Sequence, residues 1–181
     1  MRRKAIVGVT LIEVSLAISV IGVALCMFLP AFIQHLQFSK FEDAGHNLNA
    51  LTRAIQSYYG STHEVRGAQR TRCLPPSAGP TPAVVGVDPV EHDFAADERG
   101  GATWAALGFQ PARPGRFAYS VSVSHARCSV TAAPGTVIAR AEARADLDGD
   151  GQYSLFRREL VVGEDGQLHD GPLLRVRDRT E

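Results

Sequence analysis

A single carboxylate stands near the start of the longest apolar run in this 181-residue chain. Glu13 is followed by residues 14–39, which contain no Asp, Glu, Lys or Arg. A charged side chain at depth in a bilayer costs about 2.5 kcal/mol or more, so a carboxylate in such a place needs a partner. The chemistry that this position indicates is charge pairing within or at the edge of a membrane.

A second group of carboxylates lies much later in the chain. Asp146, Asp148 and Asp150 occupy alternate positions and are followed by a glycine and Gln152. Carboxylates at positions one, three and five, then a glycine, match the first half of a calcium-binding loop, whose twelfth position is a bidentate Glu. Here that position is Arg157. The three carboxylates and the Gln152 carbonyl are candidate Ca²⁺ ligands, and a metal-free Asp-Gly hairpin turn is the alternative.

The sequence contains three cysteines. Cys26 lies within the apolar run, where it is most simply a small apolar residue. Cys73 and Cys128 lie after the apolar run. If that run spans a membrane and this part of the chain is exported from the cytoplasm, the two thiols can be oxidised there. A disulfide between them would close a loop of about 55 residues and contribute roughly 4 kcal/mol in the chain-entropy model. The alternative is two unpaired thiols.

The apolar run is long enough to cross about 30 Å of hydrocarbon as a helix. Arg2, Arg3 and Lys4 precede it, and positive charges on that side keep the N-terminus in the cytoplasm. We therefore expect a single membrane-spanning helix with the C-terminal domain outside the cytoplasm. The formal net charge is zero, so composition does not point to nucleic acid.

The helical pattern continues beyond the apolar run, so one helix is predicted from about residue 9 to residue 59. Its second half is amphipathic, because apolar residues recur at steps of three and four. These residues are Phe38, Phe41, Ala44, Leu48, Leu51, Ile55, Tyr58 and Tyr59. Such a stripe needs a sheet or another helix to cover it.

Residues 61–115 are rich in Pro and Gly and predict a long irregular connection. Within it, residues 103–108 predict one helical turn with a glycine stop, and Trp104 is expected to fill the core. Arg66, Arg70 and Arg72 form a small basic cluster that could contact phosphates.

After Pro114 the apolar period changes to two, which is typical of strands with one solvated face. The predicted strands cover residues 117–123, 137–145, 153–162 and 173–176. The fold class is therefore α+β.

The G-V-T-L-I-E stretch at 8–13, preceded by a short basic segment, resembles the processing site of class III signal sequences. Type IV pilins and type II secretion pseudopilins carry such sequences. The resemblance implies that a prepilin peptidase cleaves after Gly8 and that the amine of Val9 is methylated. Glu13 then stands at the fifth mature position, where the family has its glutamate. The first mature residue is Val where the family most often has Phe.

This resemblance also supplies a partner for Glu13. Cleavage creates an ammonium group on Val9, and a carboxylate four residues further on lies on the same helical face. The resemblance implies that Glu13 of an incoming subunit pairs with the Val9 amine of a subunit already in the filament. Two groups that are each costly in lipid would then satisfy one another.

The fold implied is the pilin fold, a long N-terminal helix packed on a roughly four-stranded antiparallel sheet. The implied organisation is a leader at 1–8, a transmembrane and filament-core half of the helix at 9–35, its amphipathic half at 36–60, an αβ loop at 61–115 and a sheet region at 116–181.

The function implied is that of a structural subunit of a type IV pilus or type II secretion pseudopilus. Its partners would be other pilin or pseudopilin subunits, the prepilin peptidase, the inner-membrane assembly platform and, before assembly, membrane lipid. The alternative is a minor or tip subunit that acts as a membrane-tethered adhesin, calcium-binding or DNA-binding module. The sequence has no phosphate-cradling glycine loop, C-x-x-C pair or nucleophile elbow, so we expect no enzymatic activity.

Overall fold

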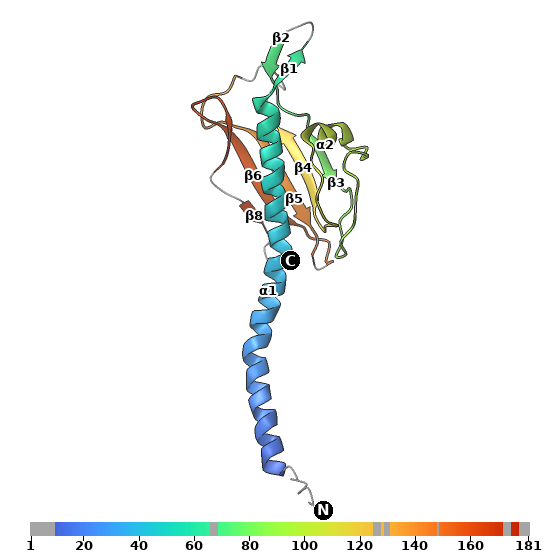
Figure 1. Ribbon diagram of the computed structural model, residues 1–181, viewed down its shortest axis with the longest axis vertical. Helices are drawn as coiled ribbons and strands as arrows, with labels where there is room; N and C mark the ends of the chain where they lie inside the picture. Colours follow the sequence, from blue (N-terminus) through green and yellow to red (C-terminus); the bar gives the residue numbers. More distant parts are fainter. Residues whose placement is uncertain are drawn as a thin grey trace, which may run out of the picture. The chain divides into compact units, whose positions relative to one another are not determined.

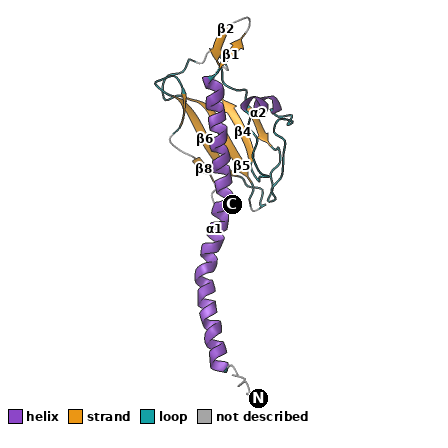
Figure 2. Ribbon diagram, viewed as in Figure 1, coloured by secondary structure: helices purple, strands orange, loops and turns teal. Residues whose placement is uncertain are grey.

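The computed structural model describes residues 10–65, 69–124, 128, 131–147, 149–171 and 175–177. The fold is α+β, and the chain divides into two compact units, Met1–Glu42 and Asp43–Glu181. Figures 1 and 2 show the order of the elements. These elements are α1 (Leu11–Gly60), β1 (Thr62–Val65), β2 (Gln69–Arg72), β3 (Ala78–Thr81), α2 (Gly101–Leu107), β4 (Ala118–Val123), β5 (Val137–Ala145), β6 (Ser154–Val162), β7 (Leu168–Asp170) and β8 (Arg175–Arg177).

The N-terminal unit contains the first part of α1. Residues Leu11–Phe28 form a helix that is long and apolar enough to cross a membrane, and none of it is buried within the protein. Leu11 is 89% exposed and Phe28 is 72% exposed. Exposing apolar surface to water costs about 25 cal/mol per Å², so this stretch requires lipid or other apolar partners.

In the globular unit, residues 43–60 of α1 lie across one face of the main sheet (Figure 1). The buried side chains of this segment recur at steps of three and four, which confirms the predicted stripe over this part of the helix. They are Ala44, Leu48, Leu51, Ile55 and Tyr59. Burying a Leu or Ile side chain contributes about 1.5–3 kcal/mol, so this stripe is a major source of stability.

Small side chains on β5 make room for the helix. Ala139, Ala141, Ala143 and Ala145 are fully buried, as the alternating pattern predicted. Ala143 pairs with Tyr119 of β4, so the two side chains share a face of the sheet. Asn47 of α1 donates a 2.9 Å hydrogen bond to the Tyr119 hydroxyl. Burial raises the pKa of Tyr119 to about 12, so the phenol stays neutral.

The opposite face of β5 and β6 is polar. Arg140 lies opposite Glu159 and Glu142 lies opposite Arg157. Each pair forms an ion pair across the two strands, at 3.2 Å and 2.6 Å respectively. Partly exposed pairs of this kind contribute little to stability, about 0–1 kcal/mol each. Their charges keep this face compatible with water.

The main sheet is antiparallel and has more strands than the roughly four that the sequence predicted. Its described strands follow the order β3-β4-β5-β6-β7, and β8 also pairs with β6. Strands β4, β5, β6 and β8 correspond to the predicted ones. β3 was missed because it contains Pro80, which removes a backbone donor and limits such a strand to a sheet edge.

Strand β7 is three residues long and was not predicted, because only Leu168 of its three residues is apolar and no alternation is visible. It nevertheless joins the helix to the sheet. Asp170 accepts a 3.2 Å hydrogen bond from Gln56 of α1 and a 2.8 Å hydrogen bond from Arg158 of β6. A strand whose main contribution is one carboxylate shared by two elements leaves no periodic signal in the sequence.

The segment 61–115 is more ordered than the irregular connection that the sequence predicted, because it contains β1, β2, β3 and α2. The predicted helical turn is confirmed, and it ends at Gly108, whose φ of 60° favours glycine. Trp104 is fully buried, which confirms its predicted place in the core. Its Nε1 donates a 3.0 Å hydrogen bond to the buried hydroxyl of Thr81 in β3.

This hydrogen bond predicts that Thr81→Val destabilises the fold. Valine has a similar shape but leaves the buried indole N–H without its acceptor, so the free energy of unfolding should fall by about 1–3 kcal/mol. Urea unfolding of the full chain in detergent, followed by Trp104 fluorescence, measures this. Thr62→Val changes an exposed threonine and is the matched control. Equal unfolding curves for the two variants would contradict the assigned role of Thr81.

Candidate functional site

The first turn of α1 supplies Glu13 with a partner inside its own helix. Glu13 Oε2 accepts hydrogen bonds from the backbone N–H of Thr10 at 2.8 Å and from the Thr10 hydroxyl at 2.9 Å. In return, the backbone N–H of Glu13 donates to Thr10 Oγ1 at 3.3 Å. This reciprocal arrangement is a capping box. The T-x-x-E spacing of residues 10–13 is the signature of this motif, although the capping box was not predicted from it.

The two bonds from Thr10 end on the same carboxylate oxygen. Among the residues that the structure describes, none donates a hydrogen bond to Glu13 Oε1. A carboxylate has about four acceptor positions. Within the part of the chain that the structure describes, one oxygen of this group is therefore held and the other is accessible. The capping box therefore fixes the direction in which Glu13 can receive an external cation.

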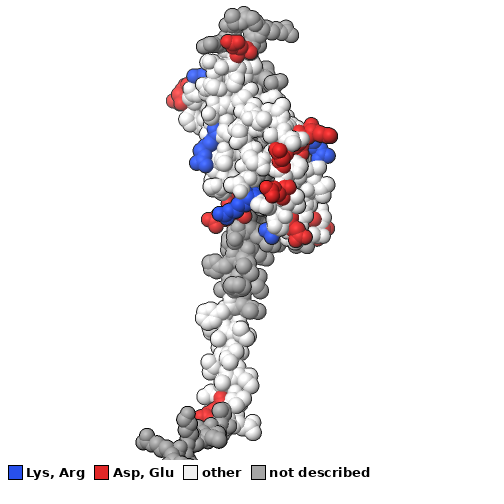
Figure 3. Space-filling model, turned by 45° about the vertical axis from the view of Figure 1, so that its right-hand side comes forward, with Lys and Arg blue, Asp and Glu red and all other residues white. Residues whose placement is uncertain are grey.

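The two serine hydroxyls of residues 11–28 are satisfied locally. Ser15 Oγ donates to the carbonyl of Ile12, and Ser19 Oγ donates to the carbonyl of Ser15, each at 2.9 Å. A polar group in hydrocarbon that lacks a partner costs several kcal/mol. With its hydroxyls bonded to its own backbone, the helix presents an apolar surface in which Glu13 is the only charged residue from 11 to 28 (Figure 3).

The predicted processing positions, Gly8 and Val9, lie outside the described residues. The closest described neighbour of the predicted cleavage point is Thr10, whose backbone N–H binds Glu13.

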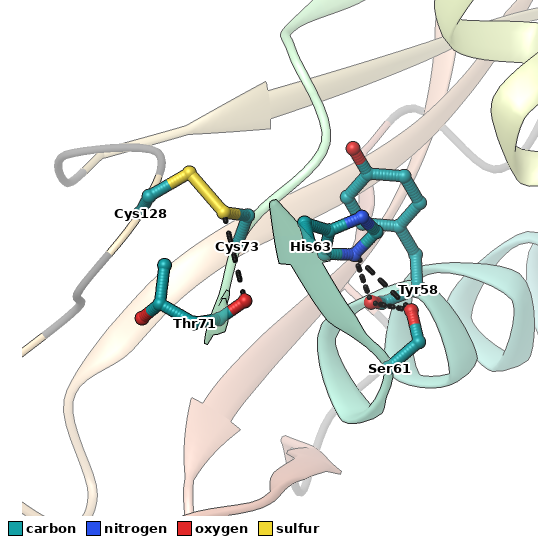
Figure 4. The surroundings of a disulfide bond; sticks show 6 residues. All are labelled: Tyr58, Ser61, His63, Thr71, Cys73 and Cys128. Carbon is teal, nitrogen blue, oxygen red and sulfur yellow. Dashed lines mark hydrogen bonds between the residues drawn. A yellow bond between two sulfur atoms is a disulfide. The ribbon is translucent and has the colours of Figure 1, made fainter. Parts of the chain in front are cut away.

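Cys73 and Cys128 form a disulfide in the structure, with their Cα atoms 4.0 Å apart (Figure 4). Cys73 directly follows β2, so the bond lies at the base of the β1–β2 hairpin. On the other strand of this hairpin, the ring of His63 stacks on Tyr58 with centroids 4.2 Å apart. His63 Nε2 also lies 2.8 Å from the Tyr58 carbonyl. The hairpin is thus fixed at its base to the sheet region and to the end of α1. The third cysteine, Cys26, is free and exposed in the N-terminal unit.

The basic cluster predicted in the 61–115 segment is described only in part. Arg66 lies outside the described residues, and the side chain of Arg70 is not described. Arg72 is exposed, and its guanidinium donates a 3.1 Å hydrogen bond to the carbonyl of Gly166. Figure 3 shows acidic and basic side chains intermixed on the visible face of the globular unit. The described charges therefore give no support to a nucleic-acid surface.

Two of the candidate calcium ligands are engaged in a turn. Asp146 accepts backbone N–H bonds from Gly149 on Oδ1, at 2.7 Å, and from Gly151 on Oδ2, at 3.1 Å. Asp150 accepts bonds from the backbone N–H and the side-chain amide of Gln152, at 2.7 Å and 2.8 Å. Asp148 lies outside the described residues.

Both glycines of this turn have positive φ, near 84° and 88°, which glycine tolerates best. Among the described residues, no group of three or more His, Cys, Asp or Glu is placed to hold a metal. The hydrogen bonds of Asp146 and Asp150 are those of a hairpin turn, and calcium binding, which includes Asp148 outside the described residues, stays a prediction.

One further pair of polar side chains, a histidine and a carboxylate, lies in the segment before α2. His92 Nε2 lies 2.8 Å from Asp97 Oδ2. Burial raises the pKa of Asp97, but hydrogen bonds from the Arg99 backbone and from the His92 and Thr81 side chains outweigh it and hold the pKa below its ordinary value. The stabilisation from this carboxylate is present at neutral pH and is lost as the pH falls through the lowered pKa. The pair therefore helps to anchor the loop that precedes α2.

The turn predicts that Asp146→Ala destabilises the protein to the same degree with and without calcium. The substitution removes the acceptor for two backbone N–H groups, so the free energy of unfolding should fall by about 1–3 kcal/mol. Thermal unfolding in calcium and in chelator measures the effect, with Asp88→Ala, at an exposed loop carboxylate, as the control. A calcium-induced rise in the wild-type Tm that Asp148→Ala abolishes would instead support the metal site.

No protein-family model, no curated protein and no solved structure matches this chain significantly. The assignment of a function therefore rests on the N-terminal sequence and on the geometry described above.

Proposed function

We propose that this protein is a pilin-like structural subunit of an extracytoplasmic filament, either a type IV pilus or a type II secretion pseudopilus. The observation that carries the proposal is Glu13, held by Thr10 with one oxygen accessible, at the start of a fully exposed apolar helix. That helix continues in sequence into an α+β unit. The leader, the G-V-T-L-I-E stretch and this α+β organisation together support a pilin fold.

The precursor is inserted in the inner membrane by its apolar helix. Three basic residues before the helix keep its N-terminus in the cytoplasm and direct the globular unit to the periplasm. The capping box lowers the cost of this state, because Glu13 already accepts two hydrogen bonds within its own chain. Prepilin peptidase cleaves after Gly8, and the new amine of Val9 is methylated.

Assembly replaces lipid around the helix by like helices of other subunits. The accessible side of Glu13 pairs with the Val9 ammonium of a neighbouring subunit, and this sets the axial register of the filament. The stability of such an interface depends on both charges. Removal of one partner leaves the other charge buried and unpaired, which is strongly destabilising. The inner-membrane assembly platform supplies the work of lifting subunits, so the protein itself performs no catalysis.

A second candidate function is that of a minor or tip subunit that presents a binding element. The β1–β2 hairpin favours it, because this hairpin forms a sheet separate from the main one and is fixed at its base by the disulfide. Immunogold labelling distinguishes the two candidates. Labels along the shaft indicate a major subunit, and labels at the ends alone indicate a tip subunit.

Processing predicts a specific N-terminal mass. The full chain, expressed with a prepilin peptidase and isolated from membranes, should begin at a methylated Val9, whereas without the peptidase it should begin at Met1. Intact-mass spectrometry measures the difference. A mass that is the same in both preparations and corresponds to the unprocessed chain would show that the protein is an ordinary membrane-anchored protein.

The capping box allows the charge of Glu13 to be tested separately from its hydrogen bonds. Glu13→Gln keeps an acceptor for Thr10 but removes the charge, so filament yield should fall at least tenfold, equivalent to about 1.4 kcal/mol. Thr10→Val removes the hydroxyl but keeps the carboxylate and should retain more assembly than Glu13→Gln. Quantitative immunoblotting of sheared filaments, with membrane levels as the reference, measures both. Wild-type filament yield from Glu13→Gln would refute the role of the charge.

A further inference from the structure

The globular unit exposes a small group of large apolar side chains that its own core does not use. Within the described residues of this unit, the large apolar side chains that are exposed are Val84 (80%), Val87 (44%), Val90 (53%) and Tyr153 (42%). Three come from the connection between β3 and α2, and the fourth directly precedes β6. We refer to these four residues as the valine patch.

Several contacts hold the segment that carries these valines against the β5–β6 turn. A Cβ atom on Gly149 would lie 3.1 Å from Val87 Cγ2, so the valine lies on the turn. Arg144 of β5 donates a 3.4 Å hydrogen bond to the Ala83 carbonyl, and its guanidinium lies 5.3 Å from the centre of the Tyr153 ring.

The same segment is fixed near β4. Arg116 Nε donates a 2.6 Å hydrogen bond to the Val87 carbonyl. Val90 forms a two-way backbone pair with Gly115, at 2.9 Å and 3.1 Å. The exposed side chains of the valine patch therefore project from a backbone that is held in place, so the patch is a defined surface.

The valine patch lies at one identifiable end of the globular unit. Ala143 pairs with Tyr119, and Asn47 of α1 bonds to the same Tyr119. The β5–β6 turn follows three residues after Ala143, and the unit begins at Asp43, one helical turn before Asn47. The patch and Asp43 are therefore at the same end, where the chain arrives from the apolar helix.

We propose that the valine patch docks on the surface of the bilayer that holds the chain's own apolar helix. The proposal rests on the membrane anchoring that the proposed function requires. Only residues 29–42 lie between Phe28, the last residue of the described apolar stretch Leu11–Phe28, and Asp43. A tether this short holds the end of the unit at a high effective concentration beside its own membrane, so the bilayer is favoured over a freely diffusing partner.

The chemistry of the patch fits a lipid headgroup layer. The headgroup region has hydrocarbon on one side and water on the other. Aliphatic side chains suit its apolar side, and a tyrosine with an arginine beside it suits its hydrated side. Asp88 and Glu91 are exposed neighbours in the same segment. Anionic lipid would repel these carboxylates. The valine patch therefore binds a bilayer of zwitterionic lipid.

The test uses the full chain in phosphatidylcholine vesicles with a polarity-sensitive fluorophore on a single added cysteine. Cys26→Ala removes the free thiol, and the Cys73–Cys128 disulfide remains oxidised and unlabelled. A label at Val84→Cys should show blue-shifted emission and quenching by lipids spin-labelled near the headgroup. A label at Ser61→Cys, an exposed position at the other end of α1, should show neither.

Vesicle flotation separates the failure of docking from the failure of anchoring. Protein that floats but gives equal spectra at the two labelled positions would overturn docking and leave the membrane anchor intact. Protein that does not float would overturn both. A blue shift at Val84→Cys that grows with the number of chains per vesicle would show that a second copy covers the patch, and this also overturns lipid docking.

Discussion

The packing of residues 43–60 of α1 on the alanines of β5 is the contact on which the globular unit depends. The helix can approach the sheet because Ala139, Ala141 and Ala143 occupy little volume and are fully buried. Leu48, Leu51 and other apolar residues fill the space between the two layers. Polar groups enter this interface only in pairs, as with Asn47 and Tyr119, because an unpaired buried polar group costs about 1–3 kcal/mol.

The same rule governs the first part of α1, which is apolar enough to cross a membrane and is not buried within the protein. Thr10 satisfies one oxygen of Glu13, and the serine hydroxyls bond to carbonyls of their own helix. A helix that satisfies its polar groups internally can exchange lipid for other apolar helices with little change in free energy. That property is what a subunit must have if it is stored in a membrane and later assembled into a filament.

The rest of the globular unit is held by contacts that join segments far apart in the sequence. Trp104 of α2 bonds to Thr81 of β3, and Asp170 of β7 bonds to both Gln56 of α1 and Arg158 of β6. The Cys73–Cys128 disulfide fixes the β1–β2 hairpin. Each of these contacts joins only two or three side chains, so each depends on a backbone that brings distant segments together.

The sequence by itself determined the features that repeat or that obey local spacing. The apolar run, the stripe from Ala44 to Tyr59, the alternation in β5 and the glycine stop after α2 could all be predicted, because periodicity reports burial directly. The capping box could also have been predicted from the T-x-x-E spacing, although it was not. Tertiary structure alone decided that β3 and β7 join the sheet, because a proline-containing strand and a three-residue strand form only when a neighbouring strand offers its edge. The sequence left a turn and a calcium loop open for Asp146 and Asp150, and the structure shows both carboxylates accepting backbone N–H bonds within their own turn, whose directions no residue spacing encodes.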